Sequence, residues 1–214
     1  GGVDEQPAEV RDNDEFLEAM FGIDADEALI VASRADDKID WTCGPRSNWP
    51  AESYLDPEAS NYAAISVCEP EKVGIDANGD PQWVYHRTKE RHRAMYLVML
   101  DDIGTKAEDP CEYGFGPPTV TLETSPGNFQ YLYKLDKPIT NRAAAQQLVT
   151  MLVRGFKRDG VDITITDPGS GDIVRFFRMP FGSNRKPHLD EPFKTVIHEM
   201  DFSRTYAPDL MAEW

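Results

Sequence analysis

The sequence predicts an α+β fold in which a helix packs on one face of a sheet. Short β-prone runs bounded by turn residues recur along the chain, and the most regular helical pattern covers residues 141–158. In the second half, the predicted elements follow the order strand, hairpin, long helix, strand and strand, which is typical of α+β domains. The length of 214 residues suits one domain, or two closely packed modules, with a sizeable apolar core.

One short helix and two strands are predicted in the first 80 residues. Asn13–Phe21 has a capping residue, acids in its first turn and apolar residues on one face, so it predicts an amphipathic helix. Ala28–Ser33 and Asn61–Cys68 are β-prone and predict strands. Between them, Trp41–Pro57 is typical of an irregular loop. The turn signals in 73–82 predict a surface hairpin or a mobile loop.

The second half begins with Ala94–Leu100, whose continuous apolar run predicts a buried central strand. Thr119–Thr124 and Phe129–Leu135 are β-rich, and the four turn residues between them have the spacing of a hairpin. Asn141–Arg158 has apolar residues along one face and predicts the long helix. The strand candidates after this helix are Val161–Thr166 and Ile173–Arg178.

The charge is distributed unevenly along the chain. There are 38 acidic and 22 basic residues, which gives a formal net charge of −16. Residues 1–80 hold 20 acidic and 5 basic residues, whereas residues 81–214 hold 18 and 17. Because phosphate contacts need clustered Lys and Arg, this balance argues against a protein that coats nucleic acid. The nearly neutral second half remains compatible with a local nucleic-acid site.

Several classes of protein are excluded by simple patterns. No apolar run approaches the roughly 20 residues of a membrane-spanning helix, and the N-terminus is acidic, so we expect a soluble protein of the cytosolic type. Cys43, Cys68 and Cys111 form no CxxC pair and are expected to be reduced structural thiols. The four histidines show no metal-ligand spacing, and Walker A, dinucleotide and Ser-His-Asp motifs are absent from the sequence.

Two adjacent carboxylates, Asp101 and Asp102, end the predicted central strand. Adjacent carboxylates at such a position repel each other and lose hydration, so they need either a cation such as Mg²⁺ or Mn²⁺ or the exposure of an ordinary turn. Asp162, Asp167 and Asp172 follow the long helix. Any one of them could complete a metal site or simply cap a turn.

Two further segments contain groups that can hold phosphate oxygens. The predicted hairpin turn offers a hydroxyl, backbone N–H groups and an amide, although Pro-Gly-Asn equally suits an ordinary turn. The run IVRFFRMPFGSNRKP offers cations and an Asn that suit a triphosphate or a template backbone, or alternatively a solvated loop. The candidates are Ser125, Gly127, Asn128 and Gln130 in the turn, and Arg175, Arg178, Asn184, Arg185 and Lys186 in the run.

Weaker signals come from aromatic and basic residues. Trp41, Trp49 and Tyr54 in the N-terminal loop suit base stacking or, as the simpler account, loop anchoring. The basic cluster of Arg87, Lys89, Arg91 and Arg93 suits either a nucleic-acid backbone or a solvated face.

The order of these segments resembles the archaeo-eukaryotic primase superfamily. The resemblance is closest to the primase and primase-polymerase domains encoded by phages and plasmids, including the plasmid RepB-type primases. It covers residues 85–190 and rests on MYLVMLDDIGTK, TVTLETSPGNFQYLYKL, GVDITITDPGSGD and VRFFRMPFGSNRKP in that order. The first 80 residues match only in the placing of a helix, two strands and an aromatic loop.

This resemblance implies an archaeo-eukaryotic primase fold. In that fold an N-terminal α/β module packs on an RRM-like antiparallel sheet, and the active site lies between them. The expected division is an acidic N-terminal module at 1–80, a catalytic module at 81–200, and a tail at 201–214 that can lead to a further domain.

The resemblance also implies a set of site residues. Asp101, Asp102 and a third acid are expected to bind two Mg²⁺ or Mn²⁺ ions and to carry the catalysis. Asp162 is the expected third acid, because it lies on the polar face of an alternating strand after the helix, and Asp167 is the alternative. Gln130 stands where many members of the superfamily have His. The residues expected to bind the nucleoside triphosphate are Ser125, Gly127, Asn128, Gln130, Arg178, Asn184 and Lys186.

The function implied is that of a DNA primase or primase-polymerase domain. It would make primers on single-stranded DNA from nucleoside triphosphates in phage or plasmid replication, in the cytoplasm of a bacterial host cell, with a replicative helicase as a further partner and no membrane. One alternative is a non-catalytic replication-initiation module that binds single-stranded DNA or a helicase. Another is a metal-dependent nuclease that uses the same carboxylates. The charge pattern predicts a narrow, metal-dependent positive cleft on an acidic body, with salt-sensitive template binding.

Overall fold

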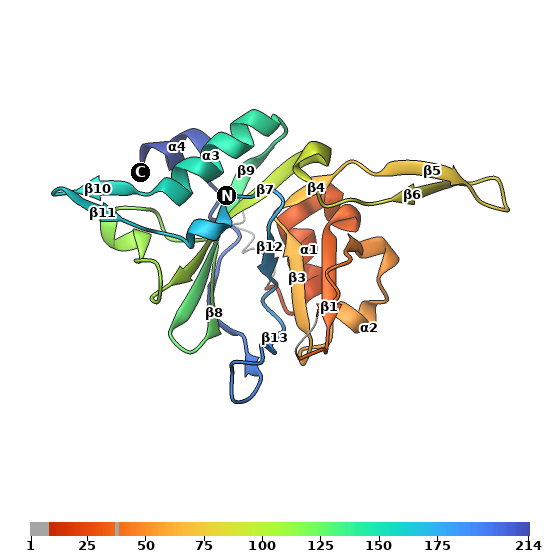
Figure 1. Cartoon of the computed structure of the whole chain (residues 1–214), viewed down its shortest axis with the longest axis horizontal. Helices are drawn as coiled ribbons and strands as arrows, with labels where there is room; N and C mark the ends of the chain where they lie inside the picture. The colour runs from red at the N-terminus through yellow and green to blue at the C-terminus, as the bar shows by residue number, and fades with distance from the viewer. Residues whose placement is uncertain (1–8, 37–38) are drawn as a thin grey trace, which may run out of the picture.

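Two antiparallel sheets form the centre of the fold and lie side by side in Figure 1. The computed structural model describes residues 9–36 and 39–214, so most of the acidic N-terminal decapeptide lies outside the described residues. The first sheet has the strand order β12-β3-β1-β2, and the second has the order β15-β8-β9-β7-β4. One continuous apolar core links both sheets with the helices. The predicted α+β class is therefore confirmed.

The first sheet carries mostly residues from the N-terminal third of the chain. Its strands are β1 (Leu29–Ser33), β2 (Gly44–Pro45), β3 (Ser60–Ala64) and β12 (Phe176–Arg178). β3 is buried along its whole length and pairs with β1 on one side and β12 on the other, with Ala63 opposite both Ile30 and Phe177. A strand from late in the chain thus completes a sheet that begins near residue 29.

The second sheet contains the predicted central strand. Its strands are β4 (Ser66–Cys68), β7 (His92–Ile103), β8 (Val120–Ser125), β9 (Asn128–Ile139) and β15 (Val196–Met200). β7 has neighbours on both sides, β9 and β4, which confirms its central position. β8 and β9 form the predicted hairpin. In β8 the burial alternates strictly between buried and half-buried residues, as expected for a strand with one face on the core.

Ile65 is the point at which the chain passes from one sheet to the other. The predicted strand Asn61–Cys68 is in fact two strands, β3 and β4, in different sheets. The N–H of Ile65 donates to the carbonyl of Arg175 beside the first sheet, and its carbonyl accepts from the N–H of Tyr96 in the second. Ile65 therefore forms backbone hydrogen bonds on both sides of the junction between the sheets. The apolar pattern of the segment is continuous, so it gives no sign of this change.

The two longer helices begin at side-chain caps. α1 (Asn13–Phe21) has the predicted bounds, and Asp12 caps it by accepting from the N–H of Glu15. α3 (Arg142–Arg154) begins after its cap Asn141 but ends at Arg154, four residues before the predicted end, with Gly155 as its C-cap. Gly155 has φ +66°, and a Cβ there would lie 2.1 Å from the carbonyl oxygen of Ile163. The chain leaves the helix at this glycine and continues as β10 (Phe156–Arg158).

The remaining short elements correct several predicted ranges. The region predicted as irregular loop contains β2 and the single-turn helix α2 (Ala51–Tyr54). β11 (Val161–Ile163) pairs with β10 and ends three residues before the predicted strand end, and β12 begins three residues after the predicted start. The 73–82 region is a hairpin of β5 (Glu71–Ile75) and β6 (Pro81–Val84) that projects from the body (Figure 1). Two further elements are the strand pair β13 (Ser183–Asn184) with β14 (Phe193–Lys194) and the terminal helix α4 (Pro208–Glu213).

The expected boundary at residue 80 crosses both sheets. β12 lies after this boundary but belongs to the first sheet, and β4 lies before it but belongs to the second. α1 packs against both, since the Phe16 ring contacts Phe177 of β12 and the carbonyl of Ala19 accepts from Lys134 of β9. The division at 1–80 and 81–200 stays a prediction. Within the described ranges, no helix is long and apolar enough to cross a membrane.

Candidate active site

A cleft with a volume of about 790 Å³ is lined by residues of both sheets. We call it the inter-sheet cleft. The first sheet contributes residues of β3 and β12, and the second contributes the end of β7 and the β8–β9 hairpin. The chain segments predicted to carry chemistry therefore meet in one place, although they lie up to 85 residues apart in sequence between Asp101 and Lys186.

Asp101 and Asp102 lie at the end of β7 and both line this cleft. Asp102 has a φ of +59°, a left-handed conformation that Asp tolerates, and the chain reverses there into a turn. The N–H of Asp102 donates to the Asp101 carboxylate at 2.9 Å. Asp101 and Asp102 therefore form a turn and also line the cleft. The two interpretations of this dipeptide, a cation site and an ordinary turn, do not exclude each other.

Asp167 is the third carboxylate in this corner of the cleft. Its N–H donates to the carbonyl of Asp101 at 3.1 Å, which fixes the two residues side by side. One guanidinium nitrogen of Arg175 lies 3.6 Å from a carboxylate oxygen of each acid. We call Asp101, Asp102 and Asp167 the acidic corner.

Asp162 lies outside the inter-sheet cleft, so the preference for it over Asp167 is not supported. Its side chain is 82% exposed on the β10–β11 hairpin, where it lies 3.7 Å from Lys157. The alternation of the segment correctly put Asp162 on a polar face. That face belongs to a small separate hairpin, because α3 ends early at Arg154 and the chain turns away from the main sheet.

Burial, mutual repulsion and nearby cations all act on the carboxylates of the acidic corner. Burial raises the pKa of Asp101, the neighbouring charge of Asp102 raises it further, and Arg175 and Lys186 act in the opposite direction. Asp102 has its own cation, Lys106, whose ammonium lies 3.5 Å from the carboxylate. As the side chains stand, no three His, Cys, Asp or Glu residues among those described are arranged to hold a metal ion. Protein cations face each of the three carboxylates instead.

The β8–β9 hairpin supplies Ser125 and Asn128 to the cleft. Gly127 does not line the cleft, and its N–H donates to the carboxylate of Glu123 at 3.0 Å. Its φ of +72° identifies it as the residue that allows the tight turn. The expected phosphate contact of Gly127 is therefore not supported, because its N–H already has a partner within the hairpin.

Gln130 is buried, and its amide bonds to the backbone of Arg178 through both its nitrogen and its oxygen. Its nitrogen donates to the carbonyl of Arg178 at 3.1 Å, and its oxygen accepts from the N–H of Arg178 at 3.0 Å. This pair of bonds joins β9 of one sheet to β12 of the other at the wall of the cleft. In this structure, Gln130 positions Arg178 through one of its two N–H donors and its oxygen.

Arg178, Asn184 and Lys186 all line the cleft but differ in accessibility. Arg178 is buried over the ring of Tyr62 and donates to the amide oxygen of Asn184 at 2.9 Å. Asn184 in turn donates to the carbonyl of Thr124, so it is held on all sides. Burial lowers the pKa of Arg178, although a guanidinium remains charged at neutral pH. Lys186 is exposed and forms no ion pair with a described residue.

An aromatic wall, formed by Trp41, Tyr62 and Phe176, lines the other part of the cleft. The Trp41 and Phe176 rings are stacked with centroids 5.6 Å apart and an interplanar angle of 28°. The guanidinium of Arg87 lies over the Phe176 ring at 4.0 Å. Trp41 remains 48% exposed, so a face of the wall is open to the cleft.

The wall contains two residues, Tyr62 and Phe176, that no local sequence pattern marks as functional. Tyr62 and Phe176 are ordinary strand residues in sequence, and only the pairing of β3 with β12 brings them together opposite the acidic corner. Arg87 was part of an ambiguous basic cluster, and Trp41 was one of three candidate stacking residues, of which Trp49 and Tyr54 lie elsewhere. His188 also reaches the cleft, from the loop after Lys186.

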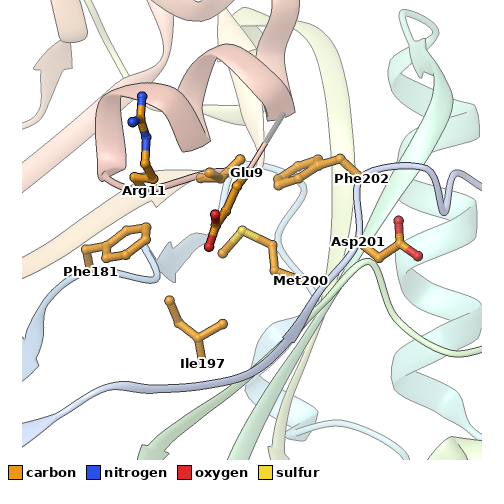
Figure 2. A pocket seen from close by; sticks show the side chains of 8 residues that line it. Glu9, Arg11, Phe181, Ile197, Met200, Asp201 and Phe202 are labelled. Carbon is orange, nitrogen blue, oxygen red and sulfur yellow. The ribbon is translucent and has the colours of Figure 1, made fainter. Parts of the chain in front are cut away.

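Another pocket, of about 520 Å³, lies away from the acidic corner (Figure 2). Phe181, Ile197, Met200 and Phe202 give it an apolar lining, Arg11 and Asp201 also line it, and the Glu9 carboxylate lies among the apolar side chains. It brings together no cluster of carboxylates facing cations. The inter-sheet cleft is therefore the better candidate for a reaction site.

Comparisons with known proteins give one family and several structures. The family model described as "RepB DNA-primase N-terminal domain" matches residues 80–197. The archaeo-eukaryotic primase (AEP) domain of the cyanophage S-2L primase-polymerase is similar in structure, with a TM-score of 0.61 and 12% identity, over 92% of this chain and 93% of that chain. No curated protein matches.

Two structures of the primase RepB′ are also similar. One gives a TM-score of 0.54 and 16% identity, over 94% of this chain and 61% of that chain. The other is the catalytic domain in complex with initiator DNA, with a TM-score of 0.50 and 18% identity, over 95% of this chain and 93% of that chain. At these identities the similarity establishes the fold, and it is the fold that the sequence resemblance implied.

Proposed function

The chain belongs to the RepB DNA-primase N-terminal domain family, and from this we propose that it makes primers on single-stranded DNA from nucleoside triphosphates. The observation that carries the proposal is the composition of the inter-sheet cleft. Three carboxylates, Asp101, Asp102 and Asp167, share it with the hydroxyl, amide and ammonium groups of Ser125, Asn128 and Lys186. Nucleotide joining needs this combination, since metal-binding acids and phosphate-binding groups must face the same reacting phosphorus.

Mg²⁺ or Mn²⁺ fits the acidic corner by the chemistry of its donors. Carboxylate oxygens are the ligands that both ions prefer, and burial, followed by the charge of Asp102, raises the pKa of Asp101. Asp101, Asp102 and Asp167 are the residues that would hold the ions. Two such ions, when bound, would favour ionisation of the primer 3′-hydroxyl and neutralise the pyrophosphate leaving group.

The triphosphate is proposed to lie along the hairpin and the loop after β12. Ser125 and Asn128 offer polar groups from the turn, and Lys186 offers an ammonium without a protein partner among the described residues. Arg178 lies deeper and contributes positive charge, while Gln130 and Asn184 hold it in place. Positioning and charge neutralisation are the main contributions that a protein makes to phosphoryl transfer.

The template is proposed to lie on the aromatic wall. Unpaired bases stack on aromatic side chains, and the guanidinium of Arg87 beside Phe176 suits a phosphate or a further stacked base. The catalytic domain of the primase RepB′ has been solved with initiator DNA, which supports DNA as the partner of this fold. We further propose a role in phage or plasmid replication, in the cytoplasm of a bacterial host, alongside a replicative helicase.

Primer synthesis on single-stranded template is the direct test. The wild type, D101N/D102N and the matched control D162N are incubated with nucleoside triphosphates and Mn²⁺ or Mg²⁺, and extended products are separated by size. We expect D101N/D102N to lose product by about 100-fold or more, because the metal ligands are removed without a change of shape. D162N removes one carboxylate charge outside the cleft and should remain active.

The same assay distinguishes the two alternatives. A nuclease would shorten a labelled strand in the absence of nucleotides and lose this activity in D101N/D102N. A non-catalytic module would bind the strand but yield no product. Its wild-type and D101N/D102N forms would then bind the strand with equal affinity, with or without metal. Either result would contradict the proposed function.

A further inference from the structure

Arg175 is anchored by its backbone, while its guanidinium reaches into the acidic corner. Its N–H donates to the carbonyl of Asp172, and its carbonyl accepts from Ile65 at the sheet junction. One guanidinium nitrogen donates to the carbonyl of Gly169, and the other lies 3.6 Å from both Asp101 and Asp167. The side chain is 28% exposed and lines the inter-sheet cleft.

We propose that Arg175 is a resident counter-ion: it neutralises Asp101 and Asp167 when no metal is bound and moves to the nucleotide phosphates when a divalent ion enters. In this way one side chain couples metal binding to nucleotide binding. The inference rests on the proposed function, since its two ligands are the metal and the triphosphate of that reaction.

The length of the contacts indicates that Arg175 can be displaced. Hydrogen-bonded ion pairs between Arg and a carboxylate have N···O distances of about 2.7–2.9 Å. Arg185 reaches Asp36 at 2.7 Å, and Arg204 reaches Glu199 at 2.7 Å, so close pairs do form elsewhere in this protein. Arg175 shares one nitrogen between two acids at 3.6 Å each. Arg175 lies close enough to offset both charges, but it forms a short hydrogen bond to neither carboxylate. A divalent ion binds carboxylate oxygens at a much shorter distance.

The groups proposed to hold the triphosphate lie in the same cleft as Arg175. These groups belong to Ser125, Asn128 and Lys186. A half-buried guanidinium without an anion is costly, so its release from the acids favours a new negative partner. Phosphate oxygens accept the planar donor fork of Arg particularly well. Metal binding therefore prepares a phosphate-binding group, and by linkage the nucleotide strengthens metal binding.

A Mn²⁺ binding titration tests this proposal without an activity assay. Electron paramagnetic resonance measures the concentration of the free ion. R175Q is compared with R204Q, a matched control in which a 27% exposed Arg also lies near two acids, Glu199 and Asp201. Without nucleotide, R175Q should bind Mn²⁺ about fivefold more tightly than wild type, since the competing cation is gone. R204Q should bind with wild-type affinity.

In the same titration with a non-hydrolysable nucleoside triphosphate, we expect Arg175 to favour Mn²⁺ binding instead of opposing it. The analogue should increase the Mn²⁺ affinity of wild type more than that of R175Q, because only wild type has the released guanidinium. R175K keeps the charge and should resemble wild type in the absence of nucleotide. Equal tightening of R175K and R175Q, or weaker Mn²⁺ binding by R175Q, would overturn the inference.

A further variant keeps this inference separate from the proposed function. D101N/D102N should lose Mn²⁺ binding whether or not Arg175 is present. If it binds Mn²⁺ like wild type, the metal site of the proposed function is wrong. If it loses Mn²⁺ while R175Q and wild type bind equally, the metal site holds and only the role of Arg175 fails. Circular dichroism of each variant confirms that the fold is retained.

Discussion

Gln130 and Arg178 are joined by two hydrogen bonds between the Gln130 amide and the Arg178 peptide groups, at 3.1 and 3.0 Å. The glutamine belongs to β9 and the arginine to β12, so the bonds connect the two sheets directly beside the inter-sheet cleft. Gln130 is therefore part of the frame that holds the cation of Arg178 at the wall of the cleft.

Replacing Gln130 by Leu should destabilise the fold more than the same replacement of an exposed glutamine. The substitution keeps a similar volume but leaves a buried N–H and a buried carbonyl of Arg178 without partners. The cost of such groups predicts a loss of about 2 kcal/mol or more in the free energy of unfolding. Urea unfolding measures it, with Q82L on the exposed β6 strand as the control. Equal unfolding midpoints for both variants would show that the bridge contributes nothing.

Gly155 should not tolerate alanine. Its φ is +66°, and a Cβ would meet the carbonyl oxygen of Ile163 at 2.1 Å, so G155A must distort the start of β10. We expect a loss of about 2 kcal/mol or more in unfolding free energy. Gly171 is the matched control, because its φ is −76° and a Cβ there has no neighbour within 4 Å among the described residues. Thermal unfolding of G155A and G171A should therefore differ, and equal stability of G155A and wild type would contradict the stated cause of the early helix end.

His92 predicts a loss of stability in mild acid. Burial lowers its pKa below the ordinary value of 6.5, and the charge of Arg142 acts in the same direction. The folded state disfavours the protonated ring, so the neutral His92 ring contributes its full stability above the unfolded-state pKa. This contribution to the free energy of unfolding is lost as the pH falls through the folded-state pKa. H92F, which cannot titrate, should lose less stability than wild type between pH 7 and about pH 5. Urea unfolding across this range tests the difference, with the exposed His188 replaced by Phe as control. Parallel curves for H92F and wild type would refute it.

Local elements could be predicted from the sequence because their causes are local. The bounds of α1 follow from its caps and apolar spacing, and the β8–β9 hairpin follows from the Ser125–Asn128 turn. The acidic pair at the end of β7 was visible for the same reason, since a continuous apolar run followed by two carboxylates is a local pattern.

Contacts between the sheets could not be predicted in this way. The change of sheet at Ile65 depends on Arg175 and Tyr96, and the pairing of β12 with β3 joins residues more than 100 positions apart. The choice between Asp162 and Asp167 depends on where α3 ends. Alternation along 161–166 favoured Asp162, whereas the glycine at 155 diverts that strand into a hairpin and leaves Asp167 beside Asp101. The family resemblance implied that these segments come together at one site. It did not decide between Asp162 and Asp167, which are five residues apart.

The aromatic wall predicts a measurable contribution to template binding. Stacking of a base on an aromatic side chain is worth about 1–3 kcal/mol by alanine substitution, so W41A should weaken binding of a fluorescent oligothymidine by about fivefold or more. W83A is the matched control, because Trp83 is 49% exposed, like Trp41 at 48%, but lies on the projecting β5–β6 hairpin. Fluorescence anisotropy titrations at fixed salt compare the two. If W83A weakens binding as much as W41A, the strand does not lie on the wall.

Asp167 and Asp162 provide the last and most direct comparison. Asp167 shares Arg175 with Asp101 in the inter-sheet cleft, whereas Asp162 is solvent-exposed beside Lys157. D167N should therefore reduce nucleotide incorporation by about 100-fold, while D162N should stay within about twofold of wild type, if the third metal ligand is the one in the cleft. Incorporation of a labelled nucleotide opposite a defined template measures both, and urea unfolding of the variants separates loss of ligand from loss of fold. A D162N enzyme that fails while D167N works would restore the assignment made from strand alternation and would require the β10–β11 hairpin to move to the cleft during catalysis.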